Sequence, residues 1–163
     1  MKKLIFLSIL LVSLSWSPAS QAGKNDIYRQ SNNPANFIRL INVPKERAAE
    51  VKLNQPYTFT EDQMADILRS LRYNRRAVFS DKVKTRRIFE EETIEKYTPF
   101  LVEAFKKVSP DQAVYFSVAQ KRPWYVVRND HLTQVEMWVV GQELHMRFGK
   151  TEAKLLGDYQ ART

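Results

Sequence analysis

A histidine and a glutamate on one expected strand are the first candidates for chemistry in this chain. His145 follows Glu143 by two residues in the run ELHMRFG, and side chains two residues apart on a strand share a face. An imidazole with a carboxylate beside it can act as a general base, or the two groups can supply two metal ligands, although a zinc site needs three or four. The other interpretation is that His145 packs on an aromatic neighbour. A small hydrolase or metal-dependent enzyme using His145 with Glu143 is therefore one functional hypothesis.

The rest of the sequence offers little catalytic chemistry. The chain has no cysteine, which excludes thiolate nucleophiles and thiolate metal sites. Its four glycines form no phosphate-binding loop, and neither a nucleophile elbow nor a paired-histidine helix motif occurs. The other histidine, His131, follows Asn129-Asp130, a pair typical of a solvated turn. We therefore expect no cofactor and no metal, and we favour a binding protein over an enzyme.

Positive charge is concentrated between residues 69 and 87. The formal net charge of the chain is +8, and this segment contributes +7 because it holds eight cations and one acid, Asp81. Such a segment can meet lipid head groups, lipopolysaccharide phosphates or nucleic acid. Alternatively, its cations guard the edge of a sheet against aggregation. The cations are Arg69, Arg72, Arg75, Arg76, Lys82, Lys84, Arg86 and Arg87.

Cations and aromatic residues also meet in QKRPWYVVRND, residues 120–130. We expect a strand here, with Arg122 and Trp124 on one side and a turn at Asn129. A two-residue turn would bury Trp124, whereas a three-residue turn would place Arg122 opposite Trp138 on an open face. Because two-residue turns are the commonest hairpin class, the buried tryptophan is favoured.

The last predicted hairpin has one apolar face and one mixed face. Gly141-Gln142 fits a two-residue type II′ turn, which would pair Trp138 with His145 and Glu136 with Arg147. The apolar face would carry Val135, Met137, Val139, Leu144, Met146 and Phe148. The mixed face, with Tyr115 added from a neighbouring strand, suits a binding partner if it is open. The alternative is that the N-terminal lead-in or the C-terminal tail covers it.

Two amphipathic helices are expected to cover the apolar face. The first spans residues 60–72, where Thr60 and Gln63 form a capping box and apolar residues recur with helical spacing. The second spans residues 91–108, with acids first and lysines last as the helix dipole prefers. Pro99 lies inside that pattern and should kink or restart the helix.

Runs with a period of two predict an antiparallel sheet. An N-terminal strand is expected over residues 37–43, and a meander of four strands over residues 113–149, in the runs AVYFSVAQ, WYVVR, LTQVEMWVV and ELHMRFG. The basic run 82–89 is expected to add to the same sheet, for example as an edge. The fold class is therefore α+β, a two-layer domain with both helices on one face of the sheet.

The first 22 residues have the features of a secretory signal peptide. Lys2 and Lys3 precede an apolar run, and small residues precede a cleavage site after Ala22. The run is shorter than the roughly 20 residues that span a bilayer. We expect a polar lead-in over residues 23–36 and one globular domain over residues 37–163, ending in a short polar tail, with no transmembrane segment after cleavage. The compact, lysine-led signal is typical of bacteria, so the expected location is the periplasm or the exterior.

These features together predict an exported, non-enzymatic binding or accessory protein of the bacterial envelope. The expected partner is an envelope protein or an anionic component such as lipid head groups or lipopolysaccharide, whereas the export signal disfavours nucleic acid. The expected contacts are the basic segment 69–87, a sheet edge or the aromatic face. The candidate contact residues are Arg75, Arg76, Lys82, Lys84, Arg86, Arg87, Arg122, Trp124, Trp138, His145 and Arg147.

Overall fold

The computed structural model describes residues 25–77, 80–124 and 127–154. The main sheet consists of β1 (Asp26–Arg29), β2 (Phe37–Asn42), β5 (Gln112–Trp124), β6 (Val127–Val140) and β7 (Glu143–Lys154). These strands lie in the order β1-β2-β5-β6-β7, and each pair is antiparallel. The structure confirms the predicted α+β class and the N-terminal strand. The strand β1 lies in the stretch that the sequence analysis treated as a polar lead-in.

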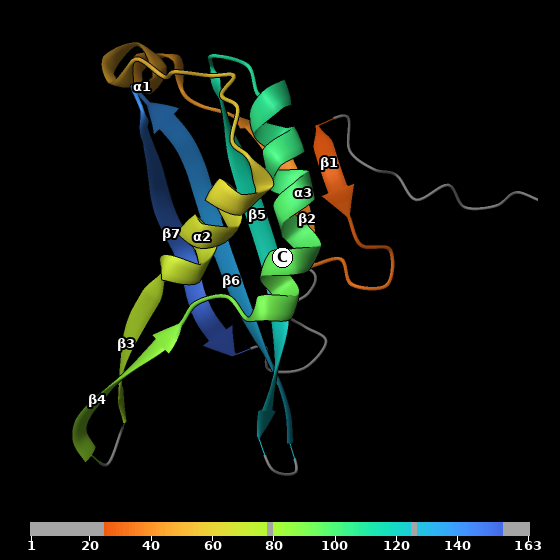
Figure 1. Ribbon diagram of the computed structural model, residues 1–163, viewed down its shortest axis with the longest axis vertical. Coiled ribbons are helices and arrows are strands. Elements are labelled where there is room, and N and C mark those ends of the chain that lie inside the picture. Colours follow the sequence, from red (N-terminus) through yellow and green to blue (C-terminus); the bar gives the residue numbers. More distant parts are fainter. Residues whose placement is uncertain (1–24, 78–79, 125–126, 155–163) are drawn as a thin grey trace, which may run out of the picture.

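Of the three helices in the described part of the chain, two lie together on one face of this sheet (Figure 1). They are α2 (Glu61–Ser70) and α3 (Glu91–Lys107), and the short α1 (Lys45–Val51) was not predicted. The capping box of α2 is confirmed, because Gln63 N donates to Thr60 Oγ1 at 3.1 Å and Thr60 N donates to Gln63 Oε1 at 3.0 Å. The helix α3 runs without a break through Pro99, so it does not restart there. None of the helices in the described ranges is long and apolar enough to cross a membrane.

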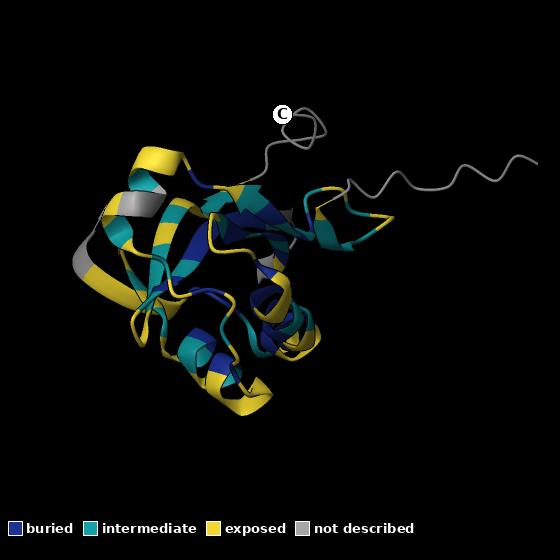
Figure 2. Ribbon diagram, turned by 90° about the horizontal axis from the view of Figure 1, so that it is seen from above, coloured by how far each residue is buried: buried dark blue, intermediate teal, exposed yellow. Residues whose placement is uncertain are grey.

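The core lies between the sheet and these two helices. Figure 2 shows buried residues on the strands and on the helix sides that face them, and exposed residues on the outer helix sides. Phe116 of β5 is fully buried, and its ring lies 5.6 Å from that of Phe89 and 5.3 Å from that of Tyr97. The sheet, α3 and the segment before α3 therefore share one aromatic cluster.

The register predicted for the last hairpin is confirmed. Trp138 pairs with His145 and Glu136 pairs with Arg147. Gly141 has a φ of 59°, and Gln142 is not among the residues with positive φ, as a type II′ turn requires. The predicted apolar face packs on the core: Val135, Met137 and Val139 are buried, and Leu144, Met146 and Phe148 are partly buried.

The turn predicted at Asn129 is wrong. Asn129 lies inside β6 and pairs with Arg122, and the pairing continues to Trp124 with Val127, so the strands run past the predicted turn. The meander therefore has three long strands rather than four, and Arg122 does not oppose Trp138. Near its turn the β5–β6 hairpin extends beyond the helices (Figure 1), where polar residues are compatible with a strand because neither face needs a core. The side chain of Trp124, whose burial was the open question, is outside the described part of the chain.

The basic run does not join the main sheet, contrary to expectation. Its residues form β4 (Ser80–Arg87), which pairs with β3 (Arg72–Ala77) in a separate two-stranded sheet. Arg72, predicted to end the first helix, instead begins β3. We call the paired strands β3 and β4, residues 72–77 and 80–87, the basic arm; it projects from the body past the end of α2 (Figure 1). A strand so rich in cations has few apolar side chains to bury, which favours a position away from the core.

Candidate binding surface

The basic arm places like charges directly opposite each other. Arg72 pairs with Arg87, and Arg75 pairs with Lys84. Like charges in such positions destabilise a strand pair, and a lone two-stranded ribbon is only marginally stable in water. The charge pattern of the arm therefore works against its own folding, as expected if an anionic partner completes it.

At the base of the arm, Glu91 of α3 neutralises part of the charge. Arg69 Nη2 lies 2.6 Å from Glu91 Oε1, and Arg87 Nη1 lies 3.5 Å from Glu91 Oε2. The hydrogen bond from Arg69, with the charges of Arg69 and Arg87, holds the pKa of Glu91 below its usual range. These two cations of segment 69–87 therefore help to attach the arm to α3.

Two cations of β4, Lys84 and Arg86, are not neutralised by any described side chain. Lys84 and Arg86 are exposed and form no ion pair within the described ranges. Val83, between Lys82 and Lys84 in β4, is 52% exposed, the one large exposed hydrophobic residue that the structure describes. Arg75, Arg76 and Lys82 lie on the same two strands, although their side chains are not described. The arm thus offers two exposed cations, Lys84 and Arg86, on the same strand as an exposed apolar residue.

A buried polar junction holds the base of the arm to the sheet. The side chain of Gln120 in β5 donates to Ile88 O at 2.8 Å and to Glu152 Oε1 at 3.1 Å, and accepts from Glu90 N at 2.8 Å. Gln120 is 3% exposed. It therefore joins the segment between the arm and α3 to two strands of the main sheet. Ile88 N also donates to Leu71 O at 3.2 Å, which closes the open end of the arm.

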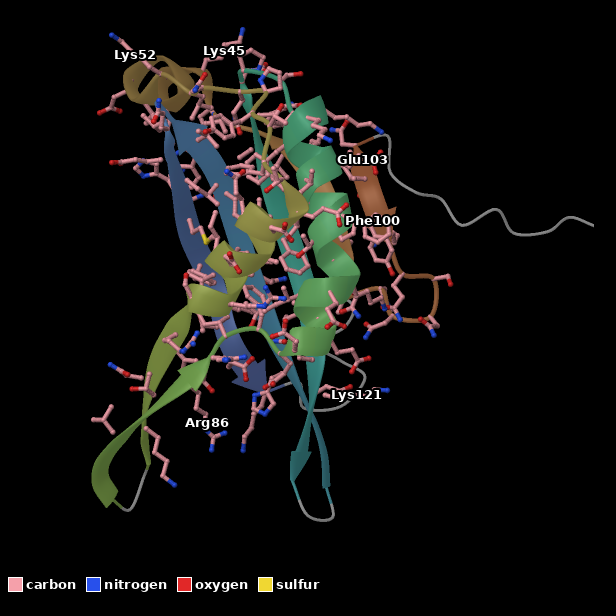
Figure 3. All side chains as sticks on the ribbon, in the orientation of Figure 1. Lys45, Lys52, Arg86, Phe100, Glu103 and Lys121 are labelled. Atoms are coloured by element: carbon pink, nitrogen blue, oxygen red, sulfur yellow. The ribbon has the colours of Figure 1, made fainter. Side chains whose placement is uncertain are left out.

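We call the paired residues 120–124 of β5 and 127–131 of β6 the tip of the β5–β6 hairpin, and they include the second group of predicted contact residues. Arg122 and Trp124 are among the last residues of β5, and they follow the exposed Lys121. This tip points toward the same end of the molecule as the basic arm (Figure 1), and Figure 3 shows Arg86 and Lys121 at that end. The structure therefore brings the two candidate groups to one end, although 33 residues separate Arg87 from Lys121 by their numbering.

The predicted aromatic face is partly covered. The rings of Trp138 and His145 are stacked, with centroids 5.9 Å apart. Arg47 of α1 places its guanidinium 4.8 Å from the Trp138 ring centroid and 3.8 Å from Glu136 Oε1, and Glu136 also pairs with Arg147. The hollow between α1 and these residues has no room for water. The described segment that covers this face is therefore α1, and Trp138 is engaged within the protein.

The second hypothesis placed a catalytic or metal site at His145 and Glu143. Their side chains do approach, with Nε2 of His145 3.6 Å from Oε2 of Glu143, but they are 42% and 83% exposed. Within the described ranges no group of three His, Asp, Glu or Cys residues could hold a metal ion. Both residues lie on the outer strand β7, and of the two it is His145 that stacks on Trp138, an arrangement that suits packing of the histidine.

We expect His145→Ala to lower the free energy of unfolding by about 0.5–1 kcal/mol, because it removes one cross-strand aromatic pair. Urea unfolding would measure this, with Glu143→Ala as the control, since Glu143 is exposed and contributes no ring. If His145→Ala instead abolished hydrolysis of a panel of ester, amide and phosphate substrates without changing stability, the packing interpretation would be wrong.

The outer side of the sheet near β1 contains a charged and aromatic group that the sequence analysis missed. Asp26 lies 2.6 Å from Nε of Arg29 and 3.3 Å from Nε of Arg39. The Arg39 guanidinium lies 4.3 Å from the ring centroid of Phe37, which stacks on Tyr115 at 5.8 Å. Tyr115, which was predicted to lie on the open face, therefore packs against Phe37. Only the unpredicted strand β1 brings Asp26 to this place.

A polar cleft of about 430 Å³ lies beside the first turns of α3. The side-chain oxygen of Gln30 accepts from Asn36 Nδ2 at 2.9 Å, Lys96 Nζ at 3.1 Å and Tyr97 Oη at 3.2 Å. Other lining residues are Asn32, Asn33, Glu90, Glu92, Thr93, Gln120, Lys121 and Asp130. The sequence analysis treated residues 23–36, which supply part of this cleft, only as a polar lead-in.

Burial raises the pKa of the Tyr97 phenol well above its ordinary value of about 10, and a neighbouring Tyr28 adds to the effect. Above about pH 10 the unfolded chain can ionise this tyrosine, but the folded chain cannot. We therefore expect stability that is constant below that pH and falls as the pH rises beyond it. Urea unfolding from pH 8 to 11 would measure the fall, and Tyr97→Phe should flatten it. An equal fall in the variant would contradict this explanation.

The sheet edges are the remaining predicted contacts. In the described ranges the outer strands of the main sheet are β1, with four residues, and β7, with twelve. A free strand edge can accept a peptide as an added strand. The longer edge, β7, is the better candidate for such a protein contact.

Comparison with known proteins identifies no relative: no protein-family model matches the chain, and no curated protein or solved structure matches it significantly. The functional interpretation therefore rests on the charges and geometry described above.

Proposed function

We propose that this protein is an exported, non-enzymatic binding protein of the bacterial envelope, and that its basic arm contacts an anionic envelope component. The observation that carries the proposal is the register of the arm, which places Arg72 opposite Arg87 and Arg75 opposite Lys84. A ribbon that served only structure would gain stability from opposite charges at these positions. Cations kept together against their mutual repulsion are typical of an anion-binding surface.

The position of the arm supports the same function. It stands clear of the body, so both of its faces can be reached by a large partner, while its base is held by Gln120 and Glu91. The arm is therefore attached at its base and accessible beyond it.

The export part of the proposal rests on the N-terminal residues of the sequence. Their short positive start, apolar run and small residues before position 23 fit a secretory signal. The lack of cysteine is compatible with an oxidising compartment, where a free thiol would be a liability.

Arg86→Gln with Lys84→Gln is expected to reduce recovery of envelope components by the protein and to weaken the dependence of recovery on salt. The test is a pull-down from solubilised envelope fractions at 50 and 300 mM salt, with immobilised protein from Gly23 onward. This chain contains every residue that the structure describes.

The matched control is Lys45→Gln with Lys52→Gln. These two exposed lysines lie at the opposite end of the molecule (Figure 3), and the change in net charge is the same. If the arm variant recovers the same components as the wild type with the same salt dependence, the proposed function is wrong. A loss that occurs equally in both variants would mean that net charge, and not the arm, drives recovery.

A further inference from the structure

We propose that the basic arm and the tip of the β5–β6 hairpin act together as a docking end for the surface of an anionic lipid bilayer. The inference rests on the proposed function, because it names the anionic component that the arm contacts. It goes further by adding the second hairpin and an apolar contribution to binding.

The first step is geometric. The two hairpins come from different sheets, yet they project beyond α2 and α3 at the same end of the molecule (Figure 1). The exposed cations Arg86 and Lys121 mark this end, while Lys45 and Lys52 lie at the other (Figure 3). A flat surface that approached this end would meet both hairpins together, whereas the helices and the covered aromatic face would stay clear of it.

The second step is chemical. Both hairpins combine cations with apolar or aromatic residues close to their ends. In the arm, exposed Val83 lies next to exposed Lys84 and pairs with Arg76. In the other hairpin, Trp124 is the last paired residue of β5 and follows Lys121, Arg122 and Pro123.

This combination matches the layers of a membrane surface. Lipid phosphates attract lysine and arginine, while tryptophan prefers the boundary between head groups and acyl chains. The charge sign fits as well, because strand residues 72–77 and 80–87 contain seven cations and one acid. The exposed valine would find an apolar environment only if the partner offers one.

A soluble polyanion is a poorer match than a bilayer. A polyphosphate or nucleic acid would use the cations but would offer no acyl layer to Val83, and tryptophan would gain only by stacking on bases. Binding to a polyanion should then vanish at high salt, whereas binding to a bilayer should leave an apolar remainder.

Tryptophan fluorescence gives a direct test. The chain from Gly23 onward contains two tryptophans, Trp124 and Trp138, so Trp138→Phe makes Trp124 the only reporter. We expect its emission to shift to the blue with vesicles containing one quarter phosphatidylglycerol in phosphatidylcholine, but not with pure phosphatidylcholine. The reciprocal variant, Trp124→Phe, reports from Trp138 near α1 and should show no shift.

Vesicle sedimentation measures the contribution of charge. A cation near an anionic surface contributes about fivefold to partitioning, so Lys84→Gln with Arg86→Gln should weaken binding about 25-fold. The control pair Lys45→Gln with Lys52→Gln should change it less than about twofold, because both lysines face away from the surface. Val83→Ser should weaken binding without altering its dependence on salt.

The outcomes separate this inference from the proposed function. In one outcome, Trp124 emission does not shift and no vesicles bind, but the arm variant still loses its partners from the envelope fraction. The proposal of bilayer docking would then be wrong, while the proposed function of the basic arm would stand. Binding to soluble polyphosphate but not to vesicles would contradict the proposal of a bilayer and would identify a soluble polyanion as the partner. If the arm variant keeps both its vesicles and its envelope partners, both proposals are wrong.

Discussion

Replacing Phe116 by alanine is expected to lower the free energy of unfolding by about 3–5 kcal/mol. The ring is fully buried and packs on Phe89 and Tyr97, so its removal leaves a cavity between the sheet, α3 and the segment that leads from the basic arm. Domains of this size are stable by only about 5–15 kcal/mol, so the variant should lie near the limit of folding.

Urea unfolding followed by circular dichroism would measure this effect, and Phe116→Leu is the conservative variant that should recover more than half of the loss. Val83→Ala serves as the surface control, because Val83 is 52% exposed and should change stability by less than about 0.5 kcal/mol. A loss for Phe116→Ala no larger than that of the control would contradict the position of the core.

Replacing Gln120 by alanine is expected to cost about 2–4 kcal/mol, although the residue is polar, because a buried group that loses a hydrogen-bond partner costs about 1–3 kcal/mol. Three hydrogen bonds disappear together: those to Ile88 O and Glu152 Oε1, and the one from Glu90 N. The change should also loosen the base of the basic arm, where these groups meet.

Gln134→Ala is the matched control for this prediction. Its side chain is only partly buried and makes one long hydrogen bond, 3.5 Å to Ser117 Oγ. Urea unfolding would compare the two variants, and amide exchange at residues 86–88 would report loosening of the arm. If Gln120→Ala proved no more harmful than Gln134→Ala, the polar junction would not hold the arm.

The parts of the fold that depend on local signals could be predicted from the sequence. The start of α2 followed from the hydrogen bonds that Thr60 and Gln63 can make, and those bonds are present. The register of the last hairpin followed from Gly141 together with strict alternation on both strands. In each case a few adjacent residues determine the geometry without help from the rest of the chain.

Parts that depend on solvent exposure rather than local propensity were predicted wrongly. Asn129 is a common turn residue, yet it lies inside β6, because the end of this hairpin has no core that would exclude polar side chains. Arg72 continued the helical pattern of α2, but it begins β3 and donates to the carbonyls of Arg69 and Leu71. In both cases the local sequence is compatible with more than one secondary structure, and the tertiary environment determines which one forms.

The candidate site was predicted in composition but not in arrangement. The cations of residues 72–87 and the group around Trp124 were both named from the sequence, but that they project at one end follows only from the topology of two separate hairpins. The aromatic pair of Trp138 and His145 was predicted correctly, whereas its cover by Arg47 was not. Segment 45–51 gave no periodic signal, so α1 was not expected there.

Amide hydrogen exchange of the chain from Gly23 onward is the most direct measurement of the central claim, that the basic arm contacts an anionic envelope component. Alone, the arm should exchange quickly, because a two-stranded ribbon with opposed cations opens easily. With lipopolysaccharide or with anionic phospholipid vesicles, we predict slower exchange in residues 72–77 and 80–87, and no change in α3 or β7. Protection that appears along β7 or over the covered aromatic face, with none in the arm, would contradict the account.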